Sequence, residues 1–465
     1  MTDLYQLTML SGYIKSGKTQ DAVFDMFFRP QEQCAPIIAA GLEQVIDYVN
    51  NLTFDKASID YLRGLGIFDK GFLEYLAKFR FSGDIWAVPE GTVVFAGEPI
   101  VTVRAPLPEA QLIETALLNI INHQTLIATK ASRIAWAAKP GTVVEFGLRR
   151  AQGPDAGIYG SRAAIIGGCA GTSNVLASRL FNSPVKGTHA HSWVMSFGSE
   201  PEAFEAFAEA YPDNCLLLVD TYDTLKSGVP NAIKVFDRLR AKGHKPVGIR
   251  LDSGDLAYLS KEARAALDAA GHADTVIFAS GDIDENVIQS LVSQGARIDV
   301  YGVGTRLITG DGASLGGVYK LAAIEAGGEW QPKMKFSNTA GKTTNPGFKK
   351  LWRIYDKETG KAFADLIALH DERPDKPLTL THPLERYKRT VLADYTAKEL
   401  QVPVFKGGRQ VYKPPALSKV AEYSAACKGT FWGEYFRLTN PHIYKVNLSD
   451  KLYELKNIML ESHIH

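Results

Sequence analysis

The stretch Val247-Gly-Ile-Arg-Leu-Asp-Ser-Gly-Asp255 joins an apolar run to a short polar turn, and an amphipathic stretch over residues 256–271 follows it. An apolar run that does not alternate with polar residues is typical of a strand buried on both faces. A turn ending in Asp before a helical pattern is typical of a helix start. The stretch therefore predicts one β-α unit, with a polar end where the strand meets the helix.

The same unit recurs along the middle of the chain. Further strands are predicted over residues 143–147, 185–188, 216–220, 276–280 and 298–302, and helices over 200–211, 225–242 and 285–295. Repeated β-α units favour a parallel sheet covered by helices. With at least six units and no dinucleotide-binding glycine fingerprint, the pattern predicts an irregular TIM-like α/β barrel over residues 141–340.

The two ends of the chain have a different rhythm. Residues 1–140 predict helices over 4–14, 42–52, 59–81 and 109–139, a strand over 21–29, and short antiparallel strands between 84 and 104. In the helix over 4–14, Tyr5 and Gln6 fall off the main apolar stripe. Beyond residue 340 we expect a hairpin over 402–412 and helices over 429–438 and 446–462. We expect residues 341–465 to pack back on residues 1–140 as one α+β domain.

Composition excludes several classes of protein. The 465 residues carry 52 Lys and Arg against 51 Asp and Glu, so no net basic field favours nucleic acid or anionic lipid. The four cysteines lie far apart, which argues against a zinc cluster and a disulfide framework. The first residues do not resemble a signal peptide, and no apolar run reaches the length of a membrane span. We therefore expect a cytoplasmic protein.

Polar residues follow each predicted strand directly. In a barrel of parallel strands, the carboxyl ends meet at one rim and carry the working side chains. An Asp before a helix is more often an N-cap than a catalyst, but so many polar strand ends in register are difficult to explain by capping alone. The candidates are Arg149, Thr188, His189, His191, Asp220, Asp223, Arg250, Asp252, Ser253, Gly254, Asp255, Ser280, Gly281, Asp282, Gly302, Gly304, Thr305 and Arg306.

The residue types at this rim indicate which class of ligand it could bind. The turns Ser280-Gly-Asp282 and Gly302-Val-Gly-Thr305 can present backbone N–H groups to a phosphate. The arginines, Arg149, Arg250 and Arg306, can bind anions, and the aspartates can hold ribose hydroxyls or a hydrated Mg²⁺. These features predict a site for a phosphorylated sugar with magnesium.

The pair His189-Ala-His191 allows three interpretations. One is a hydrogen-bonded structural histidine beside a solvated one, and another is a catalytic imidazole. The third is the H-x-H zinc pair of metal-dependent barrel amidohydrolases. Such a zinc site needs further histidines at later strand ends, but His244 and His272 fall in predicted helix-to-strand turns, at the opposite mouth. This placement counts against zinc.

Five motifs occur together in order: Thr2-Asp-Leu-Tyr-Gln-Leu-Thr-Met9, Glu145-Phe-Gly-Leu-Arg149, Gly187-Thr-His-Ala-His-Ser192, Arg250-Leu-Asp-Ser-Gly-Asp255 and Gly302-Val-Gly-Thr305. Together they resemble the nicotinate phosphoribosyltransferase family. The resemblance implies that nicotinate and phosphoribosyl pyrophosphate give nicotinate mononucleotide and pyrophosphate, with coupled ATP hydrolysis and Mg²⁺. These are steps of NAD biosynthesis and salvage.

The resemblance also implies roles for single residues. His191 matches the phosphorylated histidine, Asp220 is expected to be the second catalytic residue, and Arg250 with Thr188 would bind nicotinate. Tyr5 matches a residue that stacks on the pyridine ring, commonly from the partner subunit, which implies a homodimer. Mg²⁺ would bind through pyrophosphate, with Asp220 as a possible ligand. The residues implied to hold phosphoribosyl pyrophosphate are Arg149, Asp252, Ser253, Gly281, Asp282, Gly302, Gly304 and Thr305.

Two alternatives stay open. Nicotinamide phosphoribosyltransferases carry an Asp after a Gly-Thr pair, placed to accept the amide N–H. Here the matching stretch reads Gly171-Thr-Ser173, so no carboxylate stands there to repel nicotinate. A non-catalytic nucleotide sensor on the same fold is the other alternative, because fold alone does not determine function.

Overall fold

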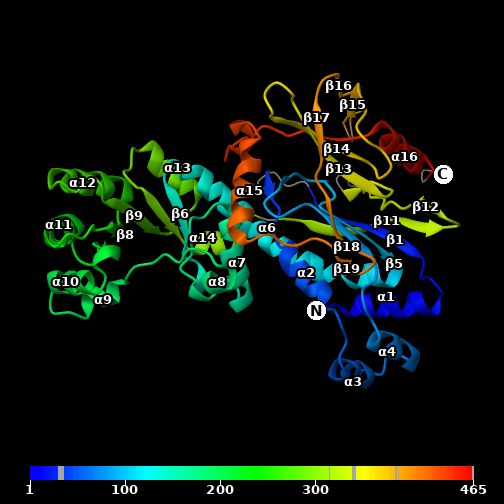
Figure 1. Ribbon diagram of the computed structural model, residues 1–465, viewed down its shortest axis with the longest axis horizontal. Coiled ribbons are helices and arrows are strands. Elements are labelled where there is room, and N and C mark those ends of the chain that lie inside the picture. Colours follow the sequence, from blue (N-terminus) through cyan, green and yellow to red (C-terminus); the bar gives the residue numbers. More distant parts are fainter. Residues whose placement is uncertain (30–35, 314, 338–341, 383–384, 386, 463–465) are drawn as a thin grey trace. The chain divides into compact units, whose positions relative to one another are not determined.

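The computed structural model describes residues 1–29, 36–313, 315–337, 342–382, 385 and 387–462. The chain divides into two compact units (Figure 1). One consists of Met1–Leu126 with Ala313–His465, and the other of Ile127–Gly312. We call them the terminal unit and the central unit. Residues 313–340 therefore belong with the two ends of the chain, although the sequence pattern placed them with the β-α units.

A five-stranded parallel sheet forms the core of the central unit. Its order is β6 (Thr142–Glu145), β10 (Val300–Val303), β9 (Val276–Gly281), β8 (Gly248–Leu251) and β7 (Leu216–Leu218). The prediction of strands in these five places is confirmed. The first strand of the unit, β6, pairs with the last, β10, and β7 forms the other edge of the sheet.

The predicted helices between these strands are also present. They are α10 (Glu200–Ala210), α11 (Val229–Ala241), α12 (Leu256–Ala269) and α13 (Glu285–Ser293). In Figure 1, α10, α11 and α12 lie in a row beside β8 and β9. Their apolar faces bury Phe204, Phe236 and Leu267 against Leu217 and Ile249 of the sheet. This packing holds the strand ends in register.

The sixth predicted strand, over residues 185–188, is wrong. This segment forms only an isolated parallel bridge between Val185 and Thr172, and Thr172 forms another with Glu145. The Val185 side chain is 54% exposed, so no sheet buries it. Two helices, α7 (Pro154–Gly167) and α8 (Val175–Phe181), precede it. The described residues thus show a parallel sheet with bridges beyond β6, in a mixed α/β fold.

The terminal unit is built on a seven-stranded antiparallel sheet. Its order is β12 (Glu329–Pro332), β11 (Gly317–Ala326), β1 (Asp21–Phe28), β5 (Val101–Pro106), β3 (Asp84–Ala87), β18 (Val402–Lys406) and β19 (Arg409–Gln410). The predicted hairpin over 402–412 is confirmed as β18 and β19, joined by Gly407 and Gly408 at positive φ. Through the pairing of β18 with β3, the two ends of the chain share one sheet.

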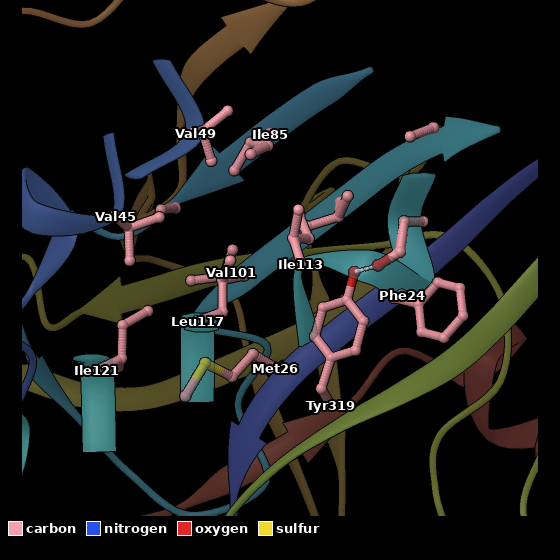
Figure 2. Close-up of a cluster of buried hydrophobic side chains, with 14 of the residues drawn as sticks. Phe24, Met26, Val45, Val49, Ile85, Val101, Ile113, Leu117, Ile121 and Tyr319 are labelled. Carbon is pink, nitrogen blue, oxygen red and sulfur yellow. Dashed lines mark hydrogen bonds between the residues drawn. The ribbon is translucent and has the colours of Figure 1, made fainter. Parts of the chain in front are cut away.

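The helices of the terminal unit cover this sheet. They include α1 (Leu4–Lys15), α2 (Leu42–Asn50), α5 (Leu107–Leu112) and α6 (Glu114–Ala137), which continues into the central unit. Figure 2 shows Met26, Val45, Ile113 and Leu117 within the shared core. There the hydroxyl of Tyr319 donates to the carbonyl of Ala110 at 2.8 Å, so this buried phenol is satisfied.

Several element boundaries differ from the prediction. The single helix over 59–81 is two, α3 (Lys56–Gly64) and α4 (Lys70–Ala77), separated by a turn with Gly66 at φ 70°. The helix over 109–139 is likewise split into α5 and α6. Gln6 was expected off the buried stripe, yet it is fully buried and its amide donates to the carbonyls of Gln111 and Leu112. Periodicity misses such polar anchors because it scores them as solvent-facing.

A second sheet, of six strands, completes the terminal unit. A two-stranded ladder of β2 (Ile37–Ile38) and β4 (Val93–Val94), from the first part of the chain, contacts it, because the carbonyl of Val93 accepts a hydrogen bond from Arg353 of the second sheet. Of the helix predicted over 429–438, only a short 3₁₀ helix over Gly433–Phe436 is formed, and the longer helix α15 (Leu417–Gly429) ends where the predicted one begins. The helix predicted over 446–462 starts with a strand and continues as α16 (Asp450–Glu461). The sheet order is β16 (Arg389–Leu392), β15 (Leu378–Thr381), β20 (Val446–Leu448), β14 (Ala362–Leu369), β13 (Lys349–Tyr355) and β17 (Thr396–Glu399).

A fully buried ion pair lies at this second sheet. The guanidinium of Arg353 donates from Nε to Asp365 at 2.9 Å and from Nη2 to the carbonyl of Val93 at 2.7 Å. Tyr444 donates to the same carboxylate at 3.0 Å. Burial raises the pKa of the nearby Glu98 well above its usual range, and the Asp365 carboxylate adds to this shift. Arg353 and Asp365 therefore form an ion pair, with the carboxyl group of Glu98 buried close to it.

We expect the variant Glu98→Gln to be more stable than the wild type at pH 7–8. A carboxyl whose folded pKa is raised keeps its proton in the folded state while the unfolded chain loses it. Stability therefore falls as pH rises above the unfolded pKa, about 4.3. Gln does not titrate, so urea unfolding should show a difference that shrinks as pH approaches 4.5. A difference that is constant from pH 4.5 to 8 would contradict this explanation.

Within the described parts of the chain, none of the helices has both the length and the apolar composition needed to span a membrane.

Candidate active site

Three neighbouring strands of the central unit bring polar side chains together at their carboxyl ends. Asp220, just beyond β7, accepts hydrogen bonds from the backbone N–H of Asp252 at 2.8 Å and the hydroxyl of Ser253 at 2.7 Å. The latter two follow β8. Because parallel strands end at the same edge, residues far apart in sequence meet here. The predicted gathering of strand ends is present.

His191 bonds to this cluster through Asp220. Its Nε2 lies 3.1 Å from Oδ1 of Asp220, and the side chains are 38% and 2% exposed, respectively. A carboxylate can only accept, so Nε2 carries a proton, and Nδ1 is the ring nitrogen left to act as a base or nucleophile. His191 is also the first residue of α9 (His191–Met195). The arrangement is an oriented, solvent-accessible imidazole with a buried acidic partner, as general-base or nucleophilic chemistry requires.

The side chain of Arg250, on β8, makes several hydrogen bonds. Its Nε donates to Ser280 at 2.8 Å and its Nη2 to Asp252 at 2.8 Å, and it lies 5.8 Å from the ring centre of Phe146. The hydroxyl of Ser280, at the end of β9, donates to the same carboxylate. The guanidinium is therefore held in one orientation with further N–H groups left over for an anion.

Asp252 is ionised in this setting. Burial acts to raise the pKa of Asp252, but hydrogen bonds from Ser280 and Arg250 outweigh it and hold the pKa below its usual value. The negative charge of Asp252 offsets the positive charge of Arg250, so the two side chains together form a polar surface with almost no net charge.

His189 is not equivalent to His191. It is buried, its Nε2 accepts the backbone N–H of Leu218 at 3.3 Å, and its ring packs against Phe207. Burial lowers the pKa of His189 to about 4, so the imidazole is neutral near pH 7. The interpretation as a hydrogen-bonded structural histidine therefore fits His189, while His191 is the accessible one.

Different physical constraints account for the glycine at each position of these turns. Gly281 has φ 120°, and a Cβ there would lie 2.8 Å from the carbonyl of Asp252. Gly302 lies inside β10, where a Cβ would meet the stacked rings of Phe146 and Phe278. Gly304 comes just before the short helix α14 (Thr305–Ile308), with Thr305 exposed at its start. Of this motif, Thr305 is exposed and Gly304 partly exposed, whereas Gly302 and Val303 are buried.

Other candidates make their hydrogen bonds to residues outside this cluster or are exposed. Arg306 pairs with Asp311, and Asp223 and Asp255 accept from backbone N–H groups as N-caps. Arg149 is exposed on a 3₁₀ turn after β6, and Asp282 is exposed beyond β9. Thr188 donates to the carbonyl of Leu216 at 2.6 Å. Tyr5 belongs to the terminal unit, on α1, with 45% of its surface exposed.

The later histidines lie where the sequence placed them, in helix-to-strand turns. His244 pairs with Asp213 and His272 with Asp237, and both precede strands. Among the described residues, no group of three or more His, Cys, Asp or Glu side chains is arranged to hold a metal ion. The zinc interpretation of His189 and His191 therefore finds no further ligands.

Two contributors to the site were missed. Glu145 is fully buried and accepts from the hydroxyls of Ser161 and Thr172, which ties β6 to the segment before α8. Phe207, on α10, packs edge-to-face against the ring of His189. A charged residue inside an apolar run was a signal for Glu145, but nothing in the sequence distinguishes Phe207 from other core residues.

Comparison with known proteins covers nearly the whole chain. Residues 1–122, 142–362 and 348–456 match the models of the nicotinate phosphoribosyltransferase N-terminal domain, family and C-terminal domain, respectively. Nicotinate phosphoribosyltransferase of Bacillus subtilis is 45% identical over 98% of this chain and 94% of its own length. The Caenorhabditis elegans enzyme of the same name is 37% identical over 98% and 92%.

Solved structures agree. The crystal structure of human nicotinic acid phosphoribosyltransferase has a TM-score of 0.86 and 30% identity, and covers 99% of this chain and all of that chain. Nicotinate-nucleotide pyrophosphorylase from Pyrococcus furiosus shares the fold, with a TM-score of 0.71 and 22% identity over 92% and 95%. With an accessible imidazole, a held arginine and this match along its length, the chain belongs to the nicotinate phosphoribosyltransferase family of enzymes.

Proposed function

We propose that this chain joins nicotinate to the ribose of phosphoribosyl pyrophosphate, giving nicotinate mononucleotide and pyrophosphate, with ATP hydrolysed to ADP and phosphate. The observation that carries the proposal is the pairing of His191 with Asp220 at the strand ends that also carry Arg250. The names of the similar enzymes support nicotinate as the acceptor.

His191 acts on ATP in this proposal. The lone pair of Nδ1 attacks the terminal phosphorus, a P–N bond forms, and the P–O bond to the leaving ADP breaks. Asp220, bonded to Nε2–H, stabilises the positive imidazole that results. Water later takes the phosphoryl group, which releases phosphate and restores the imidazole. The added charge of the phosphohistidine reorganises the pocket around the sugar pyrophosphate.

Transfer of the sugar rests on position and charge. The bond from the ribose to pyrophosphate breaks and the pyridine nitrogen forms the new bond, through a transition state with positive charge on the sugar. Bringing the two reactants together supplies much of the rate. We assign the nicotinate carboxylate to Arg250, with Thr188 close by. Phosphoribosyl pyrophosphate is assigned to Arg149, Asp252, Ser253, Gly281, Asp282, Gly304 and Thr305, with Gly302 shaping the wall beneath them.

Magnesium enters as part of the pyrophosphate complex in this proposal. Both carboxylate oxygens of Asp220 already have protein partners, which disfavours it as a metal ligand. Asp282 is exposed at the end of β9 and is the better candidate. When bound, the ion would neutralise charge on the leaving group.

We further propose a closed, irregular TIM-like barrel, in which the segment from Thr172 to Thr188 completes the ring between β6 and β7. The bridges from Glu145 to Thr172 and from Thr172 to Val185 support it. We also propose a homodimer in which the exposed Tyr5 stacks on the pyridine ring in a partner's site.

Replacing Arg250 with alanine should weaken nicotinate binding by about 2–5 kcal/mol, because it removes one partner of a desolvated charge pair. Steady-state kinetics at saturating phosphoribosyl pyrophosphate would show this as a raised KM for nicotinate. The exposed Arg306, paired with Asp311, provides a control, since Arg306→Ala removes an arginine bonded outside the cluster. An unchanged KM for nicotinate in Arg250→Ala would rule out this role.

Product analysis tests the proposal as a whole. The purified chain is incubated with phosphoribosyl pyrophosphate and either nicotinate or nicotinamide, with and without ATP. Nicotinate mononucleotide, formed faster with ATP, is expected. Preference for nicotinamide would favour the nicotinamide branch despite Ser173, and binding without any product would favour a sensor.

A further inference from the structure

The outer edge of β7 is completed by two side chains instead of a strand. β7 pairs with β8 through the backbone of Cys215 and Val219, so the carbonyl of Leu216 and the N–H of Leu218 face the other way. Thr188 Oγ1 donates to that carbonyl at 2.6 Å, and His189 Nε2 accepts that N–H at 3.3 Å. One donor and one acceptor thus replace the ladder that a neighbouring strand would supply.

His189 also contacts the two other elements around the site. Its backbone carbonyl accepts from Nη1 of Arg250 at 3.4 Å, and its ring lies 4.7 Å from the ring of Phe207 on α10. Two residues further on, His191 bonds to Asp220, which itself comes two residues after Leu218. The segment that contains His191 and the strand that leads to Asp220 are therefore hydrogen-bonded to each other two residues away from the His191–Asp220 pair.

We propose that His189 is a positioning residue for the transfer reaction: its neutral imidazole locks the end of β7 to the segment before α9, and so sets the pairing of His191 with Asp220 and the orientation of Arg250. The kinetic part of this inference rests on the proposed function. The geometric part does not, because it concerns a hydrogen bond between two residues of the free protein.

A second anchor lies on the other side of His191. The indole N–H of Trp193 donates to the carbonyl of Ala203 at 3.0 Å, and its ring packs on Phe207. This anchor fixes α9 to α10, but it makes no bond to β7. Of the two, only His189 connects α9 to the strand that leads to Asp220, so Trp193 cannot replace it.

The chemistry of the ring suits this role. An acceptor Nε2 requires the proton on Nδ1, which points toward the carbonyl of Ala190 at 3.4 Å. Leucine can fill the space of the ring without an acceptor, whereas glutamine offers an amide oxygen that can accept the N–H of Leu218. These two substitutions separate packing from hydrogen bonding.

The test compares His189→Leu with His189→Gln. His272→Leu is the matched control, since His272 is also buried in the central unit, against Phe236, but bonds to Asp237 in a helix-to-strand turn. We measure kcat, KM for nicotinate and the melting temperature. His189→Leu should lose about 10- to 100-fold in kcat with a raised KM, since small displacements of catalytic groups cost this much. His189→Gln should recover most of it, and His272→Leu should lose stability only.

Equal kinetics in His189→Leu and the wild type would overturn the proposal. So would a loss in His189→Gln as deep as in His189→Leu, because then the acceptor is not what matters. Spectra of the protein with ¹⁵N-labelled histidine test the geometry without substrate. The Nε2 proton of His191 should be protected in the wild type and His189→Gln and lost in His189→Leu; its retention there would also overturn the proposal. Failure of the wild type to make nicotinate mononucleotide would instead remove the proposed function and leave the spectra to decide.

Discussion

The variant His191→Ala is expected to lose nicotinate-dependent ATP hydrolysis while still forming nicotinate mononucleotide slowly. Without the imidazole there is no acceptor for the phosphoryl group, so coupling disappears. Sugar transfer depends on positioning and on Arg250, which the substitution leaves in place. ADP release and product formation are measured in the same reaction. Asp220→Asn should reduce coupling by at least about 10²-fold, because it removes the charge that stabilises the positive imidazole.

His244→Ala provides the control. His244 is 34% exposed, close to the 38% of His191, and is likewise paired with an aspartate, Asp213. It lies in a helix-to-strand turn of the same unit, so its loss should leave both reactions unchanged. If His191→Ala still couples ATP hydrolysis to transfer, the phosphohistidine is wrong and another group accepts the phosphoryl.

The second large effect concerns stability. Arg353→Met should lower the free energy of unfolding by about 3–5 kcal/mol, because it leaves Asp365 charged and unpaired inside the protein. The pair is fully buried, and the guanidinium also stacks on Phe431 at 4.8 Å and holds the carbonyl of Val93. Its loss therefore also loosens the contact between the early strand β4 and the second sheet. Urea unfolding at pH 7.5 measures the change.

Two further variants isolate the cause. The double variant Arg353→Met with Asp365→Leu should recover much of the lost stability, since neither charge remains. Arg437→Met removes an exposed arginine whose partner Glu434 lies 3.8 Å away, and should cost at most about 1 kcal/mol. A double variant as unstable as Arg353→Met alone would show that packing, not the unpaired carboxylate, accounts for the loss.

The parts of the fold that sequence predicted are those in which local pattern and burial agree. Val247 to Asp252 reads as a buried strand and is one, because both its faces are covered. Asp223 and Asp255 were possible caps or catalysts, and they are caps. His191, Asp220, Arg250 and Asp252 were placed at one rim from predicted strand ends, and these four do meet, although the segment before His191 forms only an isolated bridge.

The rest depended on contacts that no local pattern records. Residues 185–188 resemble a strand, yet Thr188 and His189 satisfy β7 through side chains while Val185 stays exposed. Gly302 belongs to a glycine-rich motif, but the stacked rings of Phe146 and Phe278 account for its lack of a side chain. The strand β11 between β12 and β1 was missed because its residues follow the last β-α unit without a break.

The seven-stranded sheet has a consequence for synthesis on the ribosome. Strands β1, β5 and β3 emerge early, but their neighbours are made much later: β11 begins at Gly317 and β18 at Val402. The whole central unit is translated in between, which takes on the order of tens of seconds at typical elongation speeds of about 5–20 residues per second. During that interval the nascent sheet has two open borders with apolar faces, the feature that chaperones bind. Slowing translation after residue 126 should therefore lengthen this exposure and lower the yield of folded protein.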